Sequence, residues 1–258
     1  MNNTTTINKN LAGIHFIVIL LCALMLSSCA SKEVTQALSR ADELMWTKPD
    51  SALVILKSLD TTALHGKSRK ARYSLLYSMA LDRNYVETTD ARIIIPAVKY
   101  YERHGSQDDR LKALFYFGRM QVNAREYDKA VVTLSRALEY SDEVSDMRML
   151  GFAYSEIAYS YSQTKNFSES RQYYGKAESF FNKAGEHRYS CMMVLGKAND
   201  CVSSLAWSEA DSLLKNIVAD ESFPTDLKAD AMATYGRMLT FCPFSDYGTA
   251  GSMFERSM

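Results

Sequence analysis

Cys29 is the residue of this chain whose position most directly suggests covalent chemistry. It closely follows an apolar run of 16 residues, positions 11–26, and Lys9 is the only charged side chain before that run. A permanent membrane-spanning helix needs about 20 apolar residues, so this shorter run is typical of a removable export signal. The sequence therefore predicts that residues 1–28 are a signal peptide.

The end of this segment, Leu26-Ser27-Ser28-Cys29, resembles the lipobox of bacterial lipoproteins. In that family the cysteine thiol is alkylated with diacylglycerol, and cleavage makes the cysteine the first residue of the mature protein. The resemblance implies lipid attachment at Cys29, with residues 29–32 as a short lipidated tether. Acyl chains contribute about 0.8 kcal/mol per buried methylene, which suffices for stable anchoring. The alternative is an ordinary secretory signal with Cys29 near the cut by chance.

Other side chains that commonly carry catalysis or bind metals are scattered. His65, His104 and His187 have no cysteine or carboxylate at ligand spacing, so we expect no metal site. A glycine-rich phosphate loop and a G-x-S-x-G turn are both missing, so we expect no cofactor and no enzymatic activity. Basic and acidic residues are equal in number, 30 of each, which leaves no global field to attract nucleic acid.

After Cys29 the sequence contains Cys191, Cys201 and Cys242, an odd number that does not describe a disulfide framework. Small buried apolar residues are the favoured interpretation. One bridge in an oxidising envelope, between Cys201 and Cys242, stays open as the alternative.

A basic cluster, Lys67, Arg69, Lys70 and Arg72, lies near a predicted helix start. Positive charge at this place opposes the helix dipole. A solvated face is the simpler interpretation, and contact with anionic headgroups or an acidic partner is the alternative.

The chain repeats with a period of 40 residues from Tyr127 to Tyr247, and less clearly upstream with a spacing of 39 residues. This length is typical of helical repeat units. Aromatic residues recur with this period at Tyr127, Phe167, Trp207 and Tyr247. Each begins a stripe with spacings of three, four and three, which lies on one face of a helix. The stripes are Ala130, Leu134 and Ala137; Ser170, Tyr174 and Ala177; Ala210, Leu214 and Ile217; and, for the last unit, Ala250 and Phe254. The pattern predicts an amphipathic second helix in each unit.

The apolar stretch before each second helix predicts a first helix. A small residue lies midway along it, at Gly118, Ala158 and Ala198, and Met238 replaces the small residue in the last unit. Short polar turns, such as residues 123–126, separate the two helices. One helix pair cannot bury both its apolar faces, so neighbouring pairs must stack.

Gly118, Tyr127, Ala130, Leu134 and Ala137 match the pattern of the tetratricopeptide repeat (TPR), and these units resemble it. The standard TPR unit has about 34 residues, so a longer period implies lengthened, TPR-like repeats. The resemblance implies an all-α fold, a TPR-like helical-repeat solenoid of about six antiparallel helix pairs.

The pairs fall into two groups along the chain. Residues 33–105 hold divergent N-terminal pairs, in which Pro96 is predicted to kink or restart its helix. Residues 106–258 hold the TPR-like repeats, with the last unit expected to be incomplete. The stretches 41–59 and 100–105 look like the start of a large group of bacterial envelope TPR proteins.

In TPR proteins the first helices line a concave groove. The resemblance places Phe115, Arg119 and Asn123, then Tyr159 and Gln163, then Asn199, in this groove. Arg119, Asn123 and Asn199 are expected to hold a peptide backbone or carboxylate, and Phe115 and Tyr159 to supply apolar contact. An ordinary mixed surface is the alternative.

These observations lead to the hypothesis of a membrane-anchored, non-catalytic scaffold. It would bind an unknown, membrane-associated protein or peptide in the bacterial cell envelope. We expect a lipid anchor in the outer membrane, with the periplasmic or surface face left open. Two alternatives remain: an accessory lipoprotein of outer-membrane assembly or nutrient uptake, and the sensor part of a TPR-containing signalling regulator, truncated after Met258.

Overall fold

The computed structural model describes residues 32–139, 141–242 and 255. Over these residues the chain forms helices and connecting turns, without a β-strand. None of the described helices combines the length and the hydrophobicity that a membrane crossing requires. Cys29 and the predicted last second helix from Tyr247 lie outside the described residues.

The chain divides into two compact units. Unit 1 is Met1–Glu87 with Arg92–Tyr100, and unit 2 is Thr88–Ala91 with Tyr101–Met258. The boundary falls inside α4 (Ile95–His104).

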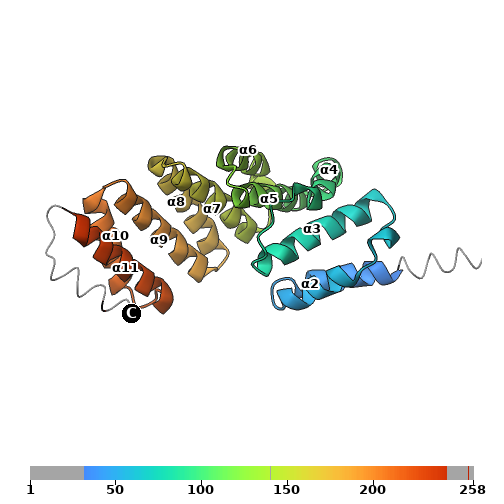
Figure 1. Ribbon diagram of the computed structural model, residues 1–258, viewed down its shortest axis with the longest axis horizontal. Coiled ribbons are helices and arrows are strands. Elements are labelled where there is room, and N and C mark those ends of the chain that lie inside the picture. The colour runs from blue at the N-terminus through green and yellow to red at the C-terminus, as the bar shows by residue number, and fades with distance from the viewer. Residues whose placement is uncertain (1–31, 140, 243–254, 256–258) are drawn as a thin grey trace, which may run out of the picture. The chain divides into compact units, whose positions relative to one another are not determined.

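Unit 1 is built from antiparallel helices joined by short connections (Figure 1). They are the helix of residues 32–44, α2 (Pro49–Ser58) and α3 (Lys67–Arg83), with the 3-10 helix η1 (Thr61–Ala63) between α2 and α3. The start of α4 also belongs to unit 1, and the 3-10 helix η2 (Ala91–Ile93) precedes it. Val34, Leu38 and Ala41, at helical spacing in the first helix, are buried. Amphipathic stripes of this kind hold the unit together.

Proline marks two helix starts. Pro49 is the first residue of α2, and Pro96 is the second residue of α4. The fixed φ of proline suits the first helical turn, where its missing N–H removes no helical hydrogen bond. The predicted helix restart at Pro96 is therefore confirmed.

Unit 2 contains a stack of helix pairs (Figure 1). Its helices are α5 (Gln107–Asn123), α6 (Tyr127–Ala137), α7 (Met147–Gln163), α8 (Phe167–Lys183), α9 (His187–Ser203), α10 (Trp207–Ala219) and α11 (Thr225–Phe241), with η3 (Ser141–Glu143) between α6 and α7. The helices α6, α8 and α10 begin at Tyr127, Phe167 and Trp207, the predicted aromatic starts. The predicted period is thus confirmed for three successive pairs.

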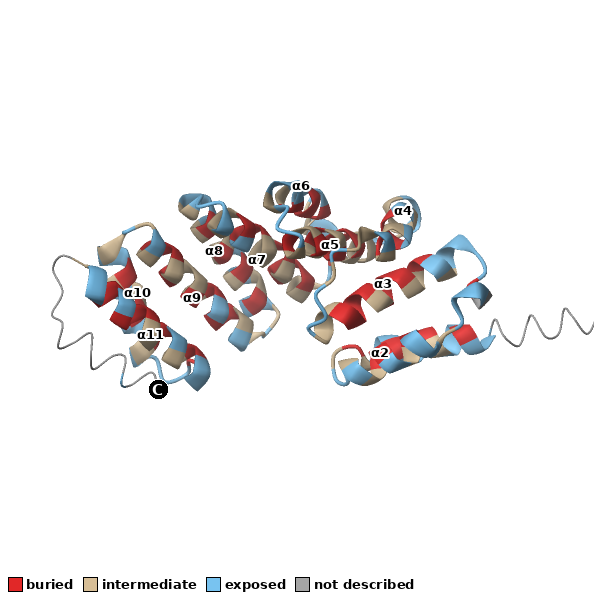
Figure 2. Ribbon diagram, in the orientation of Figure 1, coloured by how far each residue is buried: buried red, intermediate tan, exposed pale blue. Residues whose placement is uncertain are grey.

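The three predicted stripes of the second helices lie in the core (Figure 2). All nine of their residues are buried, from Ala130 to Ile217. Opposite them, a Cβ added at Gly118 would lie 2.7 Å from Leu134 Cγ, closer than carbon atoms pack. The missing side chain at Gly118 therefore lets α5 and α6 approach closely.

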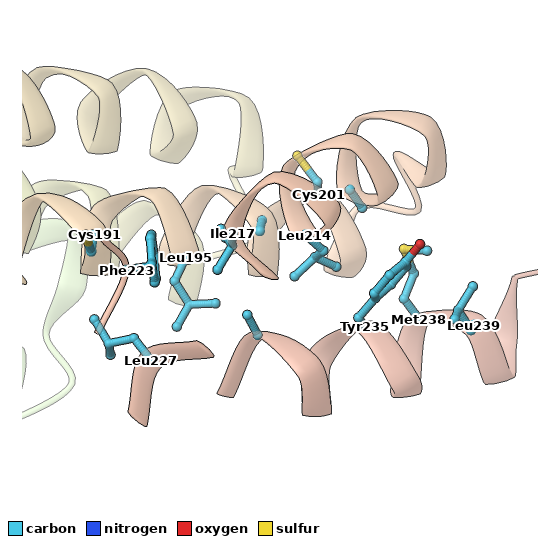
Figure 3. Close-up of a cluster of buried hydrophobic side chains, with 13 residues drawn as sticks. Cys191, Leu195, Cys201, Leu214, Ile217, Phe223, Leu227, Tyr235, Met238 and Leu239 are labelled. Carbon is cyan, nitrogen blue, oxygen red and sulfur yellow. The ribbon is translucent and has the colours of Figure 1, made fainter. Parts of the chain in front are cut away.

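Helices α9, α10 and α11 enclose a cluster of buried hydrophobic side chains (Figure 3). It includes Leu214 and Ile217 from α10 and Tyr235 from α11. Cys191 and Cys201 are buried in this cluster as free thiols, and Cys242 is also a free thiol. The cysteines of α9 thus act as small apolar residues, and Cys201 does not pair with Cys242.

The turns inside the pairs share one backbone geometry. Arg125, Lys165 and Leu205, each one period after the last, have φ values of 59°, 63° and 60°. In the first of these turns the N–H of Glu126 donates to the carbonyl of Gln121 at 2.8 Å. This hydrogen bond and the left-handed residue define a Schellman motif, which ends the first helix and reverses the chain.

The last pair departs from the period. The starts of α5, α7 and α9 are one period apart, but α11 begins at Thr225, which is two positions earlier than the period requires. The small residue midway along α11 is therefore Gly236, which is buried, and not Met238 as the strict period predicts. The shift arises because α10 has 13 residues where α8 has 17, while the connection after α10 (220–224) is only two residues longer than the connection after α8 (184–186).

Candidate binding groove

A cavity of about 530 Å³ lies between the first helices α9 and α11. It occupies the face on which the groove of a TPR protein is expected. Its lining residues are Leu195, Asn199, Val202 and Ser203 from α9 and Asp230, Ala233, Thr234, Arg237 and Phe241 from α11. We call this the α9–α11 cavity. Its size falls in the range of ligand-binding pockets in proteins.

A chain of hydrogen bonds crosses the α9–α11 cavity. Thr234 Oγ1 donates to Asn199 Oδ1 at 3.0 Å, and Arg237 Nη2 donates to Thr234 Oγ1 at 3.0 Å. These bonds fix the half-buried amide of Asn199 and hold the guanidinium of Arg237 at the cavity wall. Of the predicted groove residues, Asn199 is the one that lines this cavity.

Exposed apolar side chains occur on three successive first helices. Tyr159 on α7 is 39% exposed, Met192 on α9 is 39% exposed and Phe241 on α11 is 75% exposed. Phe241 belongs to the cavity lining. Large apolar side chains that remain exposed gain free energy when a partner covers them.

The side chain of Arg119 is engaged in packing α5 against α7. Its Nη1 lies 2.9 Å from Oε1 of Glu156, and both side chains are partly buried. This ion pair engages Nη1 and offsets the charge of the guanidinium, which reduces its attraction for a peptide carboxylate. Arg119 therefore joins two repeats in this structure, and its expected role of holding a ligand stays a prediction.

Phe115 and Asn123 are also occupied within unit 2. Phe115 is 4% exposed, and its ring lies 6.2 Å from that of Phe152 on α7. Asn123 Nδ2 donates to the carbonyl oxygen of Thr88 at 3.1 Å. The expectation that Phe115 offers apolar surface is corrected: it is a core residue, because α7 packs over it.

Tyr159 and Gln163 remain on the surface of α7. The ring of Tyr159 meets Tyr127 edge-on, with centroids 6.3 Å apart. Partial burial, followed by the charge interaction with Tyr127, raises the pKa of Tyr159, so its hydroxyl stays neutral and can donate a hydrogen bond. Gln163 is exposed at the end of the same helix.

Thr234, Arg237 and Phe241 are site residues that the strict period misses. A strict 40-residue period places the start of α11 two residues too late, so it assigns the groove-facing positions of α11 to the wrong residues. Gly236 could have revealed the shifted register of α11 from the sequence, because it is a small residue at the same helical position as Gly118, Ala158 and Ala198 in α5, α7 and α9. No group of three or more histidine, cysteine or acidic side chains in the described ranges could hold a metal ion.

No protein-family model matches the chain, and no curated protein matches it. Solved structures do. The apo form of RapI is similar with a TM-score of 0.67 and 16% identity, over 87% of this chain and 81% of RapI. A Rap protein complexed with competence and sporulation factor has a TM-score of 0.61 and 14% identity, over 88% of this chain and 65% of the Rap protein.

A third structure is a signal transduction ATPase with numerous domains and a tetratricopeptide repeat sensor, from Pyrococcus horikoshii. It has a TM-score of 0.67 and 14% identity, and covers 88% of this chain. The fold is TPR-like. This chain spans 36% of the Pyrococcus protein, and the likeness concerns the arrangement of helices.

Proposed function

We propose that this protein is a non-catalytic scaffold that binds an extended peptide segment of a partner protein in the α9–α11 cavity. The cavity itself carries the proposal. It combines an exposed aromatic ring, Phe241, with hydrogen-bonding side chains such as Ser203 and Arg237 along its walls. Apolar lining with a few placed polar groups is typical of sites that fix a ligand's orientation.

The charges around the cavity favour a peptide of mixed character. Asp230 and Arg237 lie on the same helix and carry opposite charges, so neither sign dominates the lining. Phe241 and Met192 would contact apolar side chains of the peptide, while Ser203 would bond to its backbone. That one TPR-like neighbour was solved in complex with a factor supports binding by this fold.

The scaffold is anchored, in this proposal, through acyl chains on Cys29. The lipobox-like ending of residues 26–29 supports the anchor. The proposed location is the outer membrane of the cell envelope. A partner associated with the same membrane would meet the cavity most often.

Site-specific photocrosslinking in cells tests the proposal. Phe241 is replaced by benzoylphenylalanine, and Val132, 62% exposed on the second helix α6, is the control position. We expect a discrete crosslinked partner from position 241 and none from position 132.

A second substitution asks whether the cavity holds that partner. Ser203→Arg places a long side chain in the cavity, whereas Ser212→Arg adds the same charge to an exposed position of α10. Ser203→Arg should abolish the crosslink, and Ser212→Arg should leave it. A crosslink that survives Ser203→Arg would contradict the proposed site.

A further inference from the structure

Two helix starts meet at one end of unit 1. The helix of residues 32–44 and α3 run in the same direction, so their first turns lie together (Figure 1). A shallow cavity of about 290 Å³ between them is lined by Thr35, Leu38, His65, Gly66, Lys67, Ser68, Arg69 and Arg72. The last turn of the antiparallel α2 reaches the same end. We call this the basic end of unit 1.

Lysine side chains dominate the charge at this end. The exposed cations are Lys32, Lys57, Lys67 and Lys70, and the partly exposed Arg69 lies among them. The acidic side chains beside them are Glu33 and Asp60, and Asp60 is bonded to the backbone and hydroxyl of Thr62. The excess of positive charge is therefore local, although the chain as a whole is balanced.

Arg72 differs from the rest of the sequence cluster. Its Nη2 lies 3.4 Å from Asp42 Oδ2 and 3.4 Å from Ser39 Oγ, on the helix of residues 32–44. It joins two helices of unit 1. Lys67 and Lys70, the two lysines of the sequence cluster, are exposed and are therefore available to an external partner.

The stability of α3 does not account for these lysines. The first turn of α3 contains no acidic residue, and its N-cap, Gly66, provides no side-chain acceptor. Cations at this position are repelled by the helix dipole. An anionic surface facing the basic end would convert this unfavourable arrangement into attraction.

The chain itself brings this end close to the proposed anchor. Lys32, the first described residue, follows Cys29 by three positions, and three residues span at most about 10 Å. Electrostatic screening at physiological salt acts over about 8 Å. An acylated Cys29 would therefore hold Lys32 at a distance from the headgroups comparable to this screening length.

We propose that the basic end of unit 1 docks on the anionic phosphate headgroups of the membrane that carries the lipid anchor. The inference rests on the proposed acylation of Cys29. It adds an orientation: helices of unit 1 stand with their basic end on the bilayer, and Lys48, in the turn at their opposite end, faces away.

Amine footprinting of the full, acylated protein in vesicles tests this orientation. Vesicles of phosphatidylcholine alone are compared with vesicles that also contain phosphatidylglycerol. Labelling of Lys67 and Lys70 should fall by about fivefold in the anionic vesicles, the factor that one cation near an anionic surface contributes. Labelling of Lys48 should not change. About 1 M salt, which shortens screening to about 3 Å, should remove the protection.

The other outcomes distinguish a failure of the docking proposal from a failure of the lipid anchor. Equal labelling of Lys67 and Lys70 in both vesicle types would overturn the docking proposal. Equal protection by inorganic phosphate without vesicles would overturn it in favour of a free anion. If the protein fails to float with phosphatidylcholine vesicles, the lipid anchor is wrong, and the docking proposal that depends on it falls as well.

Discussion

Single residues hold the turns of this protein in a conformation that usually requires glycine. Tyr85, Arg125, Lys165 and Leu205 all have positive φ values, and successive members of this set are one period apart. A side chain costs roughly 1–2 kcal/mol in the left-handed region, because Cβ approaches the following carbonyl oxygen. Each turn therefore stores a cost that the packing of the helix pairs must offset.

Leu205→Gly should stabilise unit 2. The side chain of Leu205 is 64% exposed, so little buried surface is lost, and relief of the left-handed strain should exceed the entropy that glycine adds to the unfolded chain. We expect a gain of about 0.5–1 kcal/mol in the free energy of unfolding, measured by urea denaturation. Ser212→Gly, in the middle of α10, is the control and should lose about 0.5 kcal/mol. A loss at position 205 would contradict the interpretation.

Asp200 is a buried carboxyl group between α7 and α9. It is 2% exposed, and its Oδ1 accepts a hydrogen bond from Ser162 Oγ at 2.6 Å. Its Oδ2 is buried and finds no hydrogen-bond partner among the described residues. Burial is the main cause that raises the pKa of Asp200, since it penalises the charged form more than Ser162, Ser170 and Arg171 together stabilise it.

Asp200→Asn should change how stability depends on pH. A folded pKa above the unfolded value means that the contribution of Asp200 is greatest below the unfolded pKa and falls as pH rises through the folded pKa. The wild-type protein should lose this stability as the pH rises above the unfolded pKa, about 3.9, and the asparagine variant should not. Thermal unfolding of both proteins across this range isolates the effect, because every other group is shared. Parallel pH profiles would refute it.

At the scale of elements, small residues and ion pairs set how the helices pack. Arg148 on α7 pairs with Glu186 at the start of α9, and one period later Arg188 on α9 pairs with Asp226 on α11. The second pair is bidentate, and its hydrogen bonds lower the pKa of Asp226 to about 2. Neighbouring repeats are thus joined by ion pairs one sequence period apart, as expected when stability resides in the interfaces.

Gly118→Ala should destabilise the first complete pair of unit 2. The added methyl group would lie 2.7 Å from Leu134, so α5 and α6 must separate, at a cost of about 1–3 kcal/mol. Gly175→Ala is the matched control in α8, where no atom lies within 4 Å of the added carbon. It should gain up to about 1 kcal/mol from helix propensity. Urea denaturation of both variants measures the contrast, and equal effects would show that the close approach is unimportant.

The whole molecule combines a proposed anchor, a unit with a basic end and a unit with a peptide-sized cavity. The cavity is formed by side chains from two repeats, so it exists only while the repeats are stacked. Cys29 precedes the first described helix in the sequence, and the buried side chains of both units come from residues that follow it. Membrane attachment and folding should therefore be separable.

Cys29→Ala tests this separation. Without the thiol no acyl chain can be attached, so the protein should lose the membrane retention that depends on the lipid. Fractionation of cells should move it from the detergent-extractable envelope to the soluble envelope fraction, with its helical circular dichroism unchanged. Retention equal to that of the wild type would count against the lipid anchor, and Cys242→Ala is the control for loss of a thiol.

Much of the fold follows from spacing along the chain. The starts of α6, α8 and α10 at Tyr127, Phe167 and Trp207, and the buried stripes after them, depend on a periodicity that residues close in sequence define. The left-handed turn residues carry no such mark, because arginine, lysine and leucine adopt that conformation only when the surrounding helices impose it.

The sequence by itself determined the helix pairs, their period and their buried faces, because these arise from local helix geometry. Only the tertiary structure decided which groove side chains remain available. Arg119 is held by Glu156 and Phe115 is covered by α7, across separations of about one repeat. The shifted register of α11 then brings Arg237 and Phe241 beside Asn199. Contacts between repeats depend on how the helices stack, and no periodic pattern within one repeat specifies them.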